Sequence, residues 1–283
     1  MIGQKELLER IDNLIAENKL PKFIIIAGSR GSGKKLLISH IVKKLGCITI
    51  GANNSVNDVR QAINEVQTVK ADKVVCTFQD ADNMSLQAKN ALLKIVEEPP
   101  KNVYFIETLE SLQNTLDTIK SRATIFNMQP YTPTEIGEYA KKYNLTSDEL
   151  GIVADICETP GDVDILYKSG IIAFDEYVTT VVNYIAEVSG ANSFNIAKKL
   201  KFKDDSDGFD LVLFFRAFIV KCSEHIFGTV ITNGLEGMEY GVVRYAEAIR
   251  ITTKHMQELN INGINKQNVV DMWILDIRSA WLD

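Results

Sequence analysis

The fold of this chain is decided by the stretch Ile24–Lys35, whose sequence is IIIAGSRGSGKK. An apolar, β-branched run leads into a glycine-rich turn, and residues 36–42 after the turn have the spacing of a helix. Gly28 and Gly33 are separated by four residues and Lys34 follows directly, which is the layout of a phosphate-binding loop. Backbone N–H groups of such a loop converge on phosphate oxygens, the helix N-terminus adds a positive dipole end, and the lysine supplies a mobile charge. The sequence therefore predicts a phosphate site at this turn.

One position of the loop departs from this layout. The residue after the lysine is normally Ser or Thr, whose hydroxyl binds Mg²⁺, and here it is Lys35. Because an ammonium group cannot ligate a metal ion, the departure indicates a nucleotide site that has lost part of its metal chemistry.

Length and composition limit the class of protein. The chain has 283 residues, which suits two or three domains, and its 46% hydrophobic and 24% charged content is typical of a globular protein with a buried core. The formal net charge of −6 argues against a protein whose main task is to grip nucleic acid. The four cysteines form no Cys-x-x-Cys pair, so neither a zinc ribbon nor a disulfide framework is expected. The N-terminus is too charged for a signal peptide and no apolar run could span a membrane, so we expect a cytoplasmic protein without membrane contact.

Strand and helix patterns alternate along the first part of the chain. Apolar runs predict strands over residues 24–27, 47–50, 73–78, 103–106 and 123–126, with helical spacing between most of them. This alternation predicts an α/β fold with a parallel sheet covered on both faces. After Pro130 only helical patterns occur, so we expect three parts: residues 1–128, a small helical domain over 129–168, and an all-helical domain over 169–283.

Further motifs give the chain a family resemblance. Residues 80–100 read DADNMSLQAKNALLKIVEEPP, and Ile119-Lys120-Ser121-Arg122 stands just before the fifth strand. With the phosphate loop and Thr159-Pro160-Gly161, these segments resemble in order the clamp-loader subunits of bacterial DNA polymerase III, and most of all the delta-prime type. The resemblance covers about residues 1–165, and the string NALLK…EEPP is its most specific part. It implies an AAA+ P-loop domain over 1–128, a helical lid over 129–168 and a helical collar over 169–283.

The resemblance also implies partners. Subunits of that family assemble with gamma/tau-like and delta-like subunits through the collar and the AAA+ face. The resulting pentamer opens the sliding clamp and loads it on primer-template DNA at the expense of ATP. We therefore expect this chain to meet the clamp and the DNA through such a complex.

Several positions depart from an active AAA+ site in addition to Lys35. The strand that should end in a metal-binding Asp ends in Gln79, which leaves Asp80 in the place of the catalytic acid. In the alternative register Asp80 is the metal ligand and Ala81 takes the catalytic place. The family's sensor arginine follows Pro-Gly, and here that residue is Asp162. Loss of one transition-state group commonly costs about 10²–10³ in rate, so several losses predict negligible hydrolysis.

Binding is separate from hydrolysis, because the glycine loop and its lysine are retained. We expect nucleotide to bind weakly or not at all, with Lys35 as a counter-charge in place of Mg²⁺. The residues of this degenerate loop are Gly28, Gly31, Gly33, Lys34 and Lys35. We expect no required cofactor, no metal site and no zinc, because only Cys47 lies where many relatives insert a four-cysteine zinc module. For Asp80 and Asp82 the favoured interpretation is that of loop carboxylates without a catalytic role.

The remaining candidates are Ser121 and Arg122. By itself Arg122 would more often be a solvated surface charge. The resemblance implies an arginine finger that enters the ATP site of an adjacent subunit, with Ala123 in place of the family's cysteine. Arginine suits this task because its planar, permanently charged fork engages phosphate oxygens. The expected function is a non-catalytic clamp-loader subunit; the alternatives are an active AAA+ ATPase, such as a gamma/tau-like motor subunit, and a delta-type clamp-opening subunit.

Overall fold

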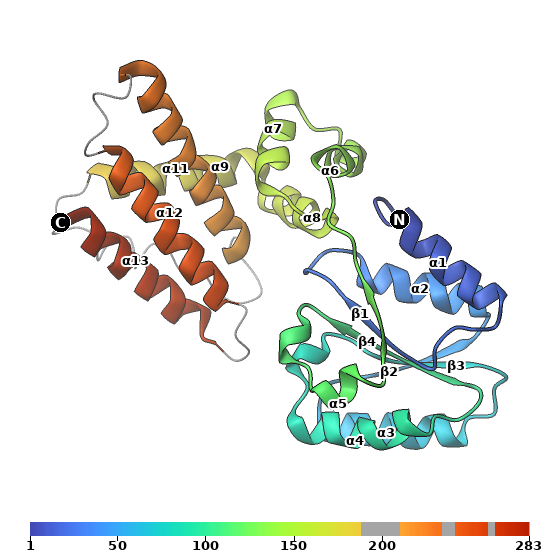
Figure 1. Cartoon of the computed structure of the whole chain (residues 1–283). Helices are drawn as coiled ribbons and strands as arrows, with labels where there is room; N and C mark the ends of the chain where they lie inside the picture. Colours follow the sequence, from blue (N-terminus) through green and yellow to red (C-terminus); the bar gives the residue numbers. More distant parts are fainter. Residues whose placement is uncertain (188–209, 234–240, 260–263, 283) are drawn as a thin grey trace. The chain divides into compact units, whose positions relative to one another are not determined.

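The chain divides into two units, of which the first contains strands and helices and the described part of the second contains helices (Figure 1). The computed structural model describes residues 1–187, 210–233, 241–259 and 264–282. The first unit consists of Met1–Glu135 with Thr159–Gly161, and the second of Ile136–Glu158 with Asp162–Asp283. Parts of the expected collar, residues 188–209, 234–240, 260–263 and 283, lie outside the described residues. The division at residues 128 and 168 stays a prediction.

A five-stranded parallel sheet forms the centre of the first unit. Its order is β2-β3-β4-β1-β5, and each neighbouring pair is parallel. The strands are β1 (Phe23–Ala27), β2 (Ile48–Ala52), β3 (Val74–Phe78), β4 (Val103–Leu109) and β5 (Thr124–Asn127). The parallel pairing of all five strands confirms the predicted α/β fold with a parallel sheet. β1 and β3 are buried along their whole length, as strands covered on both faces must be.

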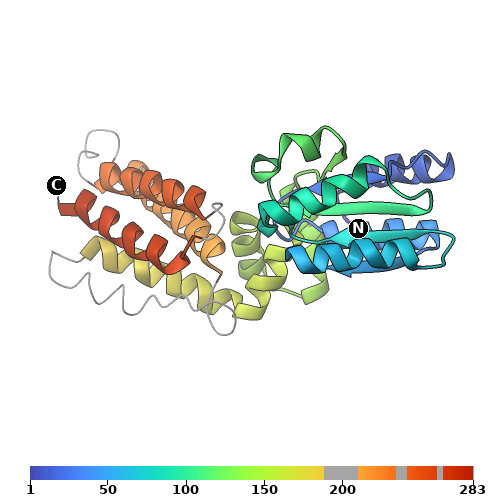
Figure 2. The same ribbon diagram turned by 90° about the horizontal axis from the view of Figure 1, so that it is seen from below.

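Helices cover both faces of the sheet, as Figure 1 shows. One face carries α1 (Lys5–Ala16) and α2 (Lys34–Leu45); the other carries α3 (Val56–Thr68), α4 (Leu86–Glu97) and the short α5 (Asp117–Lys120). Successive side chains of β1 enter different cores: Ile24 and Ile26 pack with α1 and α2, whereas Phe23 and Ile25 pack with α3 and α4. Figures 1 and 2 show α3 and α4 running side by side.

Two serines fix the starts of the helices on the second face. Ser55 Oγ accepts a hydrogen bond from the N–H of Asp58 before α3, and Ser85 Oγ accepts one from the N–H of Ala88 before α4, both at 3.2 Å. Each cap satisfies a backbone donor that the first helical turn leaves unpaired.

The described part of the second unit is helical. Its longer helices are α6 (Pro133–Ala140), α7 (Ser147–Ile156), α8 (Pro160–Ser169), α9 (Ile171–Glu187), α11 (Leu211–Asn233), α12 (Gly241–Glu258) and α13 (Lys266–Leu282), of which α6 and α8 begin in the first unit. Phe214, Phe215 and Phe218 of α11 are buried and surround Trp273 of α13, so these aromatic side chains form part of a core. None of the helices in the described ranges combines the length and apolar character needed to cross a membrane.

Candidate functional site

The predicted phosphate loop, residues 28–33, joins β1 to α2. Gly31 and Gly33 have φ angles of 77° and 91°, in the left-handed region that favours glycine. The N–H of Ser32 donates to the carbonyl of Ser29 at 3.3 Å and closes the turn. The hydroxyl oxygen of Ser32 is buried and has no hydrogen-bond partner within the described residues. The loop therefore contains one buried polar group that an additional partner could satisfy.

Lys34, the first residue of α2, is folded back under this loop. Its Nζ donates to the carbonyl of Gly28 at 2.7 Å and to the carbonyl of Ser29 at 3.1 Å. Only 7% of the residue is exposed, and burial lowers the pKa of its amino group from the ordinary value. The ammonium group is thus held by loop carbonyls, and it must exchange those bonds before it can reach a phosphate.

The loop is covered by other segments of the same unit. The N–H of Gly161 donates to the carbonyl of Gly31 at 3.1 Å, and Tyr131 Oη donates to the carbonyl of Ser32 at 2.7 Å. A Cβ atom on Gly31 would lie 2.5 Å from Thr159 Oγ1 and 2.8 Å from Gly161 Cα. The tip of the loop therefore packs directly on the backbone at residues 159–161, and neither glycine can carry a side chain without displacing the other.

Lys35 faces the acid that follows β3. Its Nζ lies 3.8 Å from Oδ2 of Asp80, and both side chains are at least half exposed. Asp80 has a φ angle of 52°, and its N–H donates to Thr108 Oγ1 at 2.9 Å. Asn54 Nδ2 donates to the carbonyls of Gln79 and Asp80 and holds this turn in place. A cation thus occupies the position expected for the metal-binding hydroxyl and is directed at the remaining carboxylate.

Asp82, the second loop carboxylate, has a structural contact. Its two carboxylate oxygens accept hydrogen bonds from the N–H groups of Glu110 and Ser111, at 2.6 Å and 3.2 Å. It therefore fixes the chain that leaves β4.

Asp162, at the position of the expected sensor arginine, pairs within the second unit. Arg216 donates from Nη1 to Oδ2 of Asp162 at 2.8 Å, and its Nη2 lies 2.6 Å from Oε2 of Glu158. No local sequence pattern indicates Arg216, because the pair joins positions 54 residues apart. Asp162 therefore serves as an acceptor for an arginine of its own unit.

Arg122 lies between α5 and β5, and its guanidinium is partly exposed. Its Nη2 is 2.7 Å from Oε1 of Glu97 at the end of α4, and its Nη1 donates to the carbonyl of Thr118 at 2.8 Å. Ser121 Oγ is 3.4 Å from Nη1 and itself donates to the carbonyl of Thr118. Among the described residues, no hydrogen bond or ion pair found for Arg122 joins it to residues 28–35. The two predicted sites of this chain are thus separate.

Glu107 is a buried carboxyl group that belongs to none of the predicted sites. It is 2% exposed in the middle of the sheet, and Oε1 has no hydrogen-bond partner among the described residues. Burial raises its pKa to about 7, while the charge of Lys89 opposes and that of Asp82 adds to this shift. The sequence signal that could have found it is the single charged residue in the strand VYFIETL.

We expect Glu107→Gln to stabilise the fold at neutral and higher pH. Between the ordinary pKa of 4.5 and the folded value of about 7, the folded chain holds a proton that the unfolded chain releases. The wild-type free energy of unfolding should therefore fall by about 3 kcal/mol as the pH rises through this window. Urea unfolding at pH 5 and pH 8 checks this: the variant should lose most of that dependence, and an unchanged dependence would contradict the assignment.

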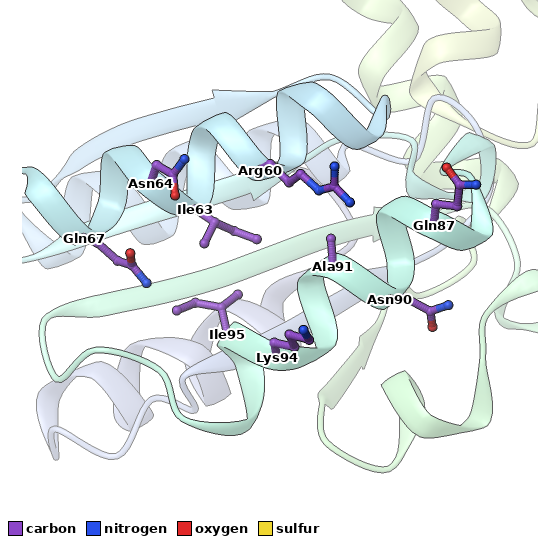
Figure 3. A pocket seen from close by; sticks show the side chains of 9 residues that line it. All are labelled: Arg60, Ile63, Asn64, Gln67, Gln87, Asn90, Ala91, Lys94 and Ile95. Atoms are coloured by element: carbon purple, nitrogen blue, oxygen red, sulfur yellow. The ribbon is translucent and has the colours of Figure 1, made fainter.

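A groove lies between α3 and α4, away from the phosphate loop (Figure 3). Its volume is about 680 Å³; Ile63, Ala91 and Ile95 supply apolar side chains and Arg60 and Lys94 supply charge. None of the predicted site residues lines it.

The part of the chain that the structure describes holds no group of three or more His, Cys, Asp or Glu side chains suited to a metal ion. The four cysteines are free thiols, and three of them are buried.

The chain is similar in sequence to subunits of DNA polymerase III and of Replication factor C. Residues 49–132 match the family model described as "DNA polymerase III, delta subunit". The chain is 27% identical over 192 residues to "DNA polymerase III subunit gamma/tau" of Mycoplasma pneumoniae, covering 56% of this chain and 28% of that protein. It is 25% identical over 180 residues to "Replication factor C small subunit" of Sulfolobus acidocaldarius, covering 58% and 55%. The matched region thus spans about half or less of the length of these relatives.

Solved structures share the fold at low identity. A DNA polymerase III gamma subunit-related protein from Thermotoga maritima superposes with a TM-score of 0.50 at 15% identity, covering 97% of this chain and 99% of that one. A RuvB variant from the same organism gives a TM-score of 0.51 at 12% identity, covering 78% and 89%. The chain therefore has an AAA+-like α/β fold followed by a helical region, contains a delta-subunit-like segment, and is homologous to gamma/tau and Replication factor C subunits.

Proposed function

We propose that this chain is a non-catalytic, delta-prime-like subunit of a DNA polymerase III clamp loader, which supplies Arg122 to the ATP site of a neighbouring subunit. The observation that carries the proposal is the ion pair of Lys35 with Asp80. Mg²⁺-dependent phosphoryl transfer needs a hydroxyl and a carboxylate around the metal. Here an ammonium group stands at the hydroxyl position and lies beside the carboxylate, which disfavours a divalent cation at that place.

The contacts of Asp162 support the same conclusion. A cation is needed beside the transferring phosphoryl group, and position 162 offers a carboxylate whose charge is balanced by Arg216. Gln79 adds an amide where a metal-binding carboxylate is needed. Because these departures involve three different segments, a single substitution would not restore hydrolysis.

Arg122 supports a role in a neighbouring subunit. It stands outside the phosphate loop of its own chain, its side chain is 37% exposed, and it follows Ser121 directly, as in the motif described above. A guanidinium at a subunit surface can engage two phosphate oxygens at once. The proposed partners are gamma/tau-like and delta-like subunits, met through the helical collar and the AAA+ face, and through them the sliding clamp and primer-template DNA.

For nucleotide at the chain's own loop, we propose weak binding that does not require Mg²⁺. Residues Gly28, Gly31, Gly33, Lys34 and Lys35 would hold it. The hydroxyl of Ser32 is buried without a hydrogen-bond partner among the described residues, so it is suited to donate to a phosphate oxygen. For phosphate to bind, Lys34 must give up its bonds to the loop carbonyls, and the packing of Gly161 on Gly31 must be accommodated. The proposed subunit requires no cofactor and no structural zinc, and elemental analysis of the purified protein tests the latter.

Titration calorimetry with ATP in EDTA should therefore detect binding in the millimolar range. Lys35→Ala should weaken it, because the counter-charge that replaces Mg²⁺ is removed. Lys19→Ala, which removes an exposed lysine outside the loop, is the matched control and should leave the heat unchanged. The absence of heat at millimolar ATP would overturn the proposal of weak binding.

The second candidate function is an active motor subunit, favoured by the homology to gamma/tau subunits.

Native mass spectrometry of the complex that copurifies with the tagged chain tests membership in a loader. The proposal predicts gamma/tau-like and delta-like subunits in fixed stoichiometry with this chain. Copurification of no such subunit would contradict it.

A further inference from the structure

We propose that Glu97 is an autoinhibitory partner of Arg122: it holds the guanidinium against its own chain, and Arg122 reaches a neighbour's nucleotide only after this pair opens. The inference rests on the proposed function of Arg122 and adds a regulatory residue to it.

The geometry shows a guanidinium turned toward its own chain. Nη2 lies 2.7 Å from Oε1 of Glu97, and Nη1 donates to the carbonyl of Thr118, four residues earlier in the chain. Ser121 Oγ lies 3.4 Å from the same Nη1. Both terminal nitrogens therefore have acceptors within this chain, although a finger uses those nitrogens to engage phosphate oxygens.

The position of Glu97 at the end of a helix explains why its carboxylate pairs with a cation. Glu97 is the last residue of α4, where the negative end of the helix dipole disfavours a carboxylate. The guanidinium of Arg122 offsets that cost. Glu98, the next residue, is also an exposed acid, but no hydrogen bond or ion pair of its side chain is found among the described residues.

The ion pair of Glu97 with Arg122 is weak enough for a bound nucleotide to open it. Its side chains are 37% and 49% exposed, so water screens the attraction. A nucleoside triphosphate carries more negative charge than one carboxylate and can therefore displace Glu97 from the guanidinium of Arg122. We expect the pair to reduce the availability of Arg122 by a few-fold, up to about fivefold, without blocking it.

The test is ATP turnover by the complete complex, assembled with wild-type chain, Glu97→Gln, Glu98→Gln or Arg122→Ala. Glutamine keeps the shape of Glu97 and removes its charge. Glu97→Gln should lower the ATP concentration for half-maximal turnover two- to fivefold, and this gain should vanish when Arg122→Ala is also present. Glu98→Gln, which removes the neighbouring charge, should behave as wild type.

The outcomes separate the two proposals. If Arg122→Ala slows hydrolysis but Glu97→Gln leaves the ATP concentration for half-maximal turnover unchanged or raises it, Glu97 is not autoinhibitory and the inference is overturned while the finger stands. The inference is equally overturned if Glu98→Gln gives the same gain, because a general effect of surface charge then explains it. If Arg122→Ala itself changes nothing, the proposed function fails.

Discussion

Replacing Arg122 with alanine is expected to slow ATP hydrolysis at the neighbouring site that it serves by about 10³-fold or more. The transferring phosphoryl group develops charge in the transition state, and a planar cation stabilises that charge. The fold of this chain should be unaffected, because the bonds of Arg122 to Glu97 and Thr118 are partly exposed to solvent.

The measurement is a single-turnover phosphate burst from the assembled complex. One site's share of the burst should move into a slow phase in the alanine variant. Arg122→Lys keeps the charge without the planar fork and should recover only part of the rate. Lys120→Ala removes a cation from the same short segment and serves as the matched control. An unchanged burst with Arg122→Ala would rule out the finger.

Replacing Trp273 with alanine is expected to destabilise the helical unit by about 3–5 kcal/mol. Trp273 is fully buried, with ring centroids of Phe214, Phe215 and Phe218 at 5.8, 5.3 and 5.0 Å. Its indole N–H donates to Thr252 Oγ1 at 2.8 Å, so the substitution leaves a cavity and removes one hydrogen bond from a buried hydroxyl, which keeps its bond to the carbonyl of Ala248.

Urea unfolding followed by far-ultraviolet circular dichroism checks this prediction. Trp273→Phe keeps most of the ring and should cost less than the alanine variant. Met272→Ala, on the same helix at a site that is 51% exposed, should change the free energy of unfolding by less than about 0.5 kcal/mol. Equal losses for Met272→Ala and Trp273→Ala would show that Trp273 is not a central core residue.

The sheet was predictable because its three central strands, β1, β3 and β4, are buried along their whole length and read as largely apolar runs. The predicted strand bound that differs most from the structure is the end of β4, which was expected at Ile106 and lies at Leu109. The prediction stopped at the acid Glu107, although the strand continues with that carboxyl group buried. Side-chain charge is therefore a weak signal for the end of a central strand.

The candidate site was predictable only in part. The replacement of the metal-binding Ser or Thr by Lys35 is visible in the sequence, because the loop fixes the spacing of its residues. The partners of Asp162 and Arg122 could not be foreseen: Arg216 and Glu97 are brought to them by tertiary packing, at separations that no local pattern encodes. The same holds for Tyr131, whose hydroxyl binds the loop carbonyl of Ser32.

The most direct test of the central claim is phosphate release by the purified chain alone, with ATP and Mg²⁺. No release above the buffer rate is expected, because Lys35, Gln79 and Asp162 replace the groups that hydrolysis needs. Steady release that disappears with Lys34→Ala would show that the chain's own loop hydrolyses ATP, and would contradict the proposed loss of hydrolysis.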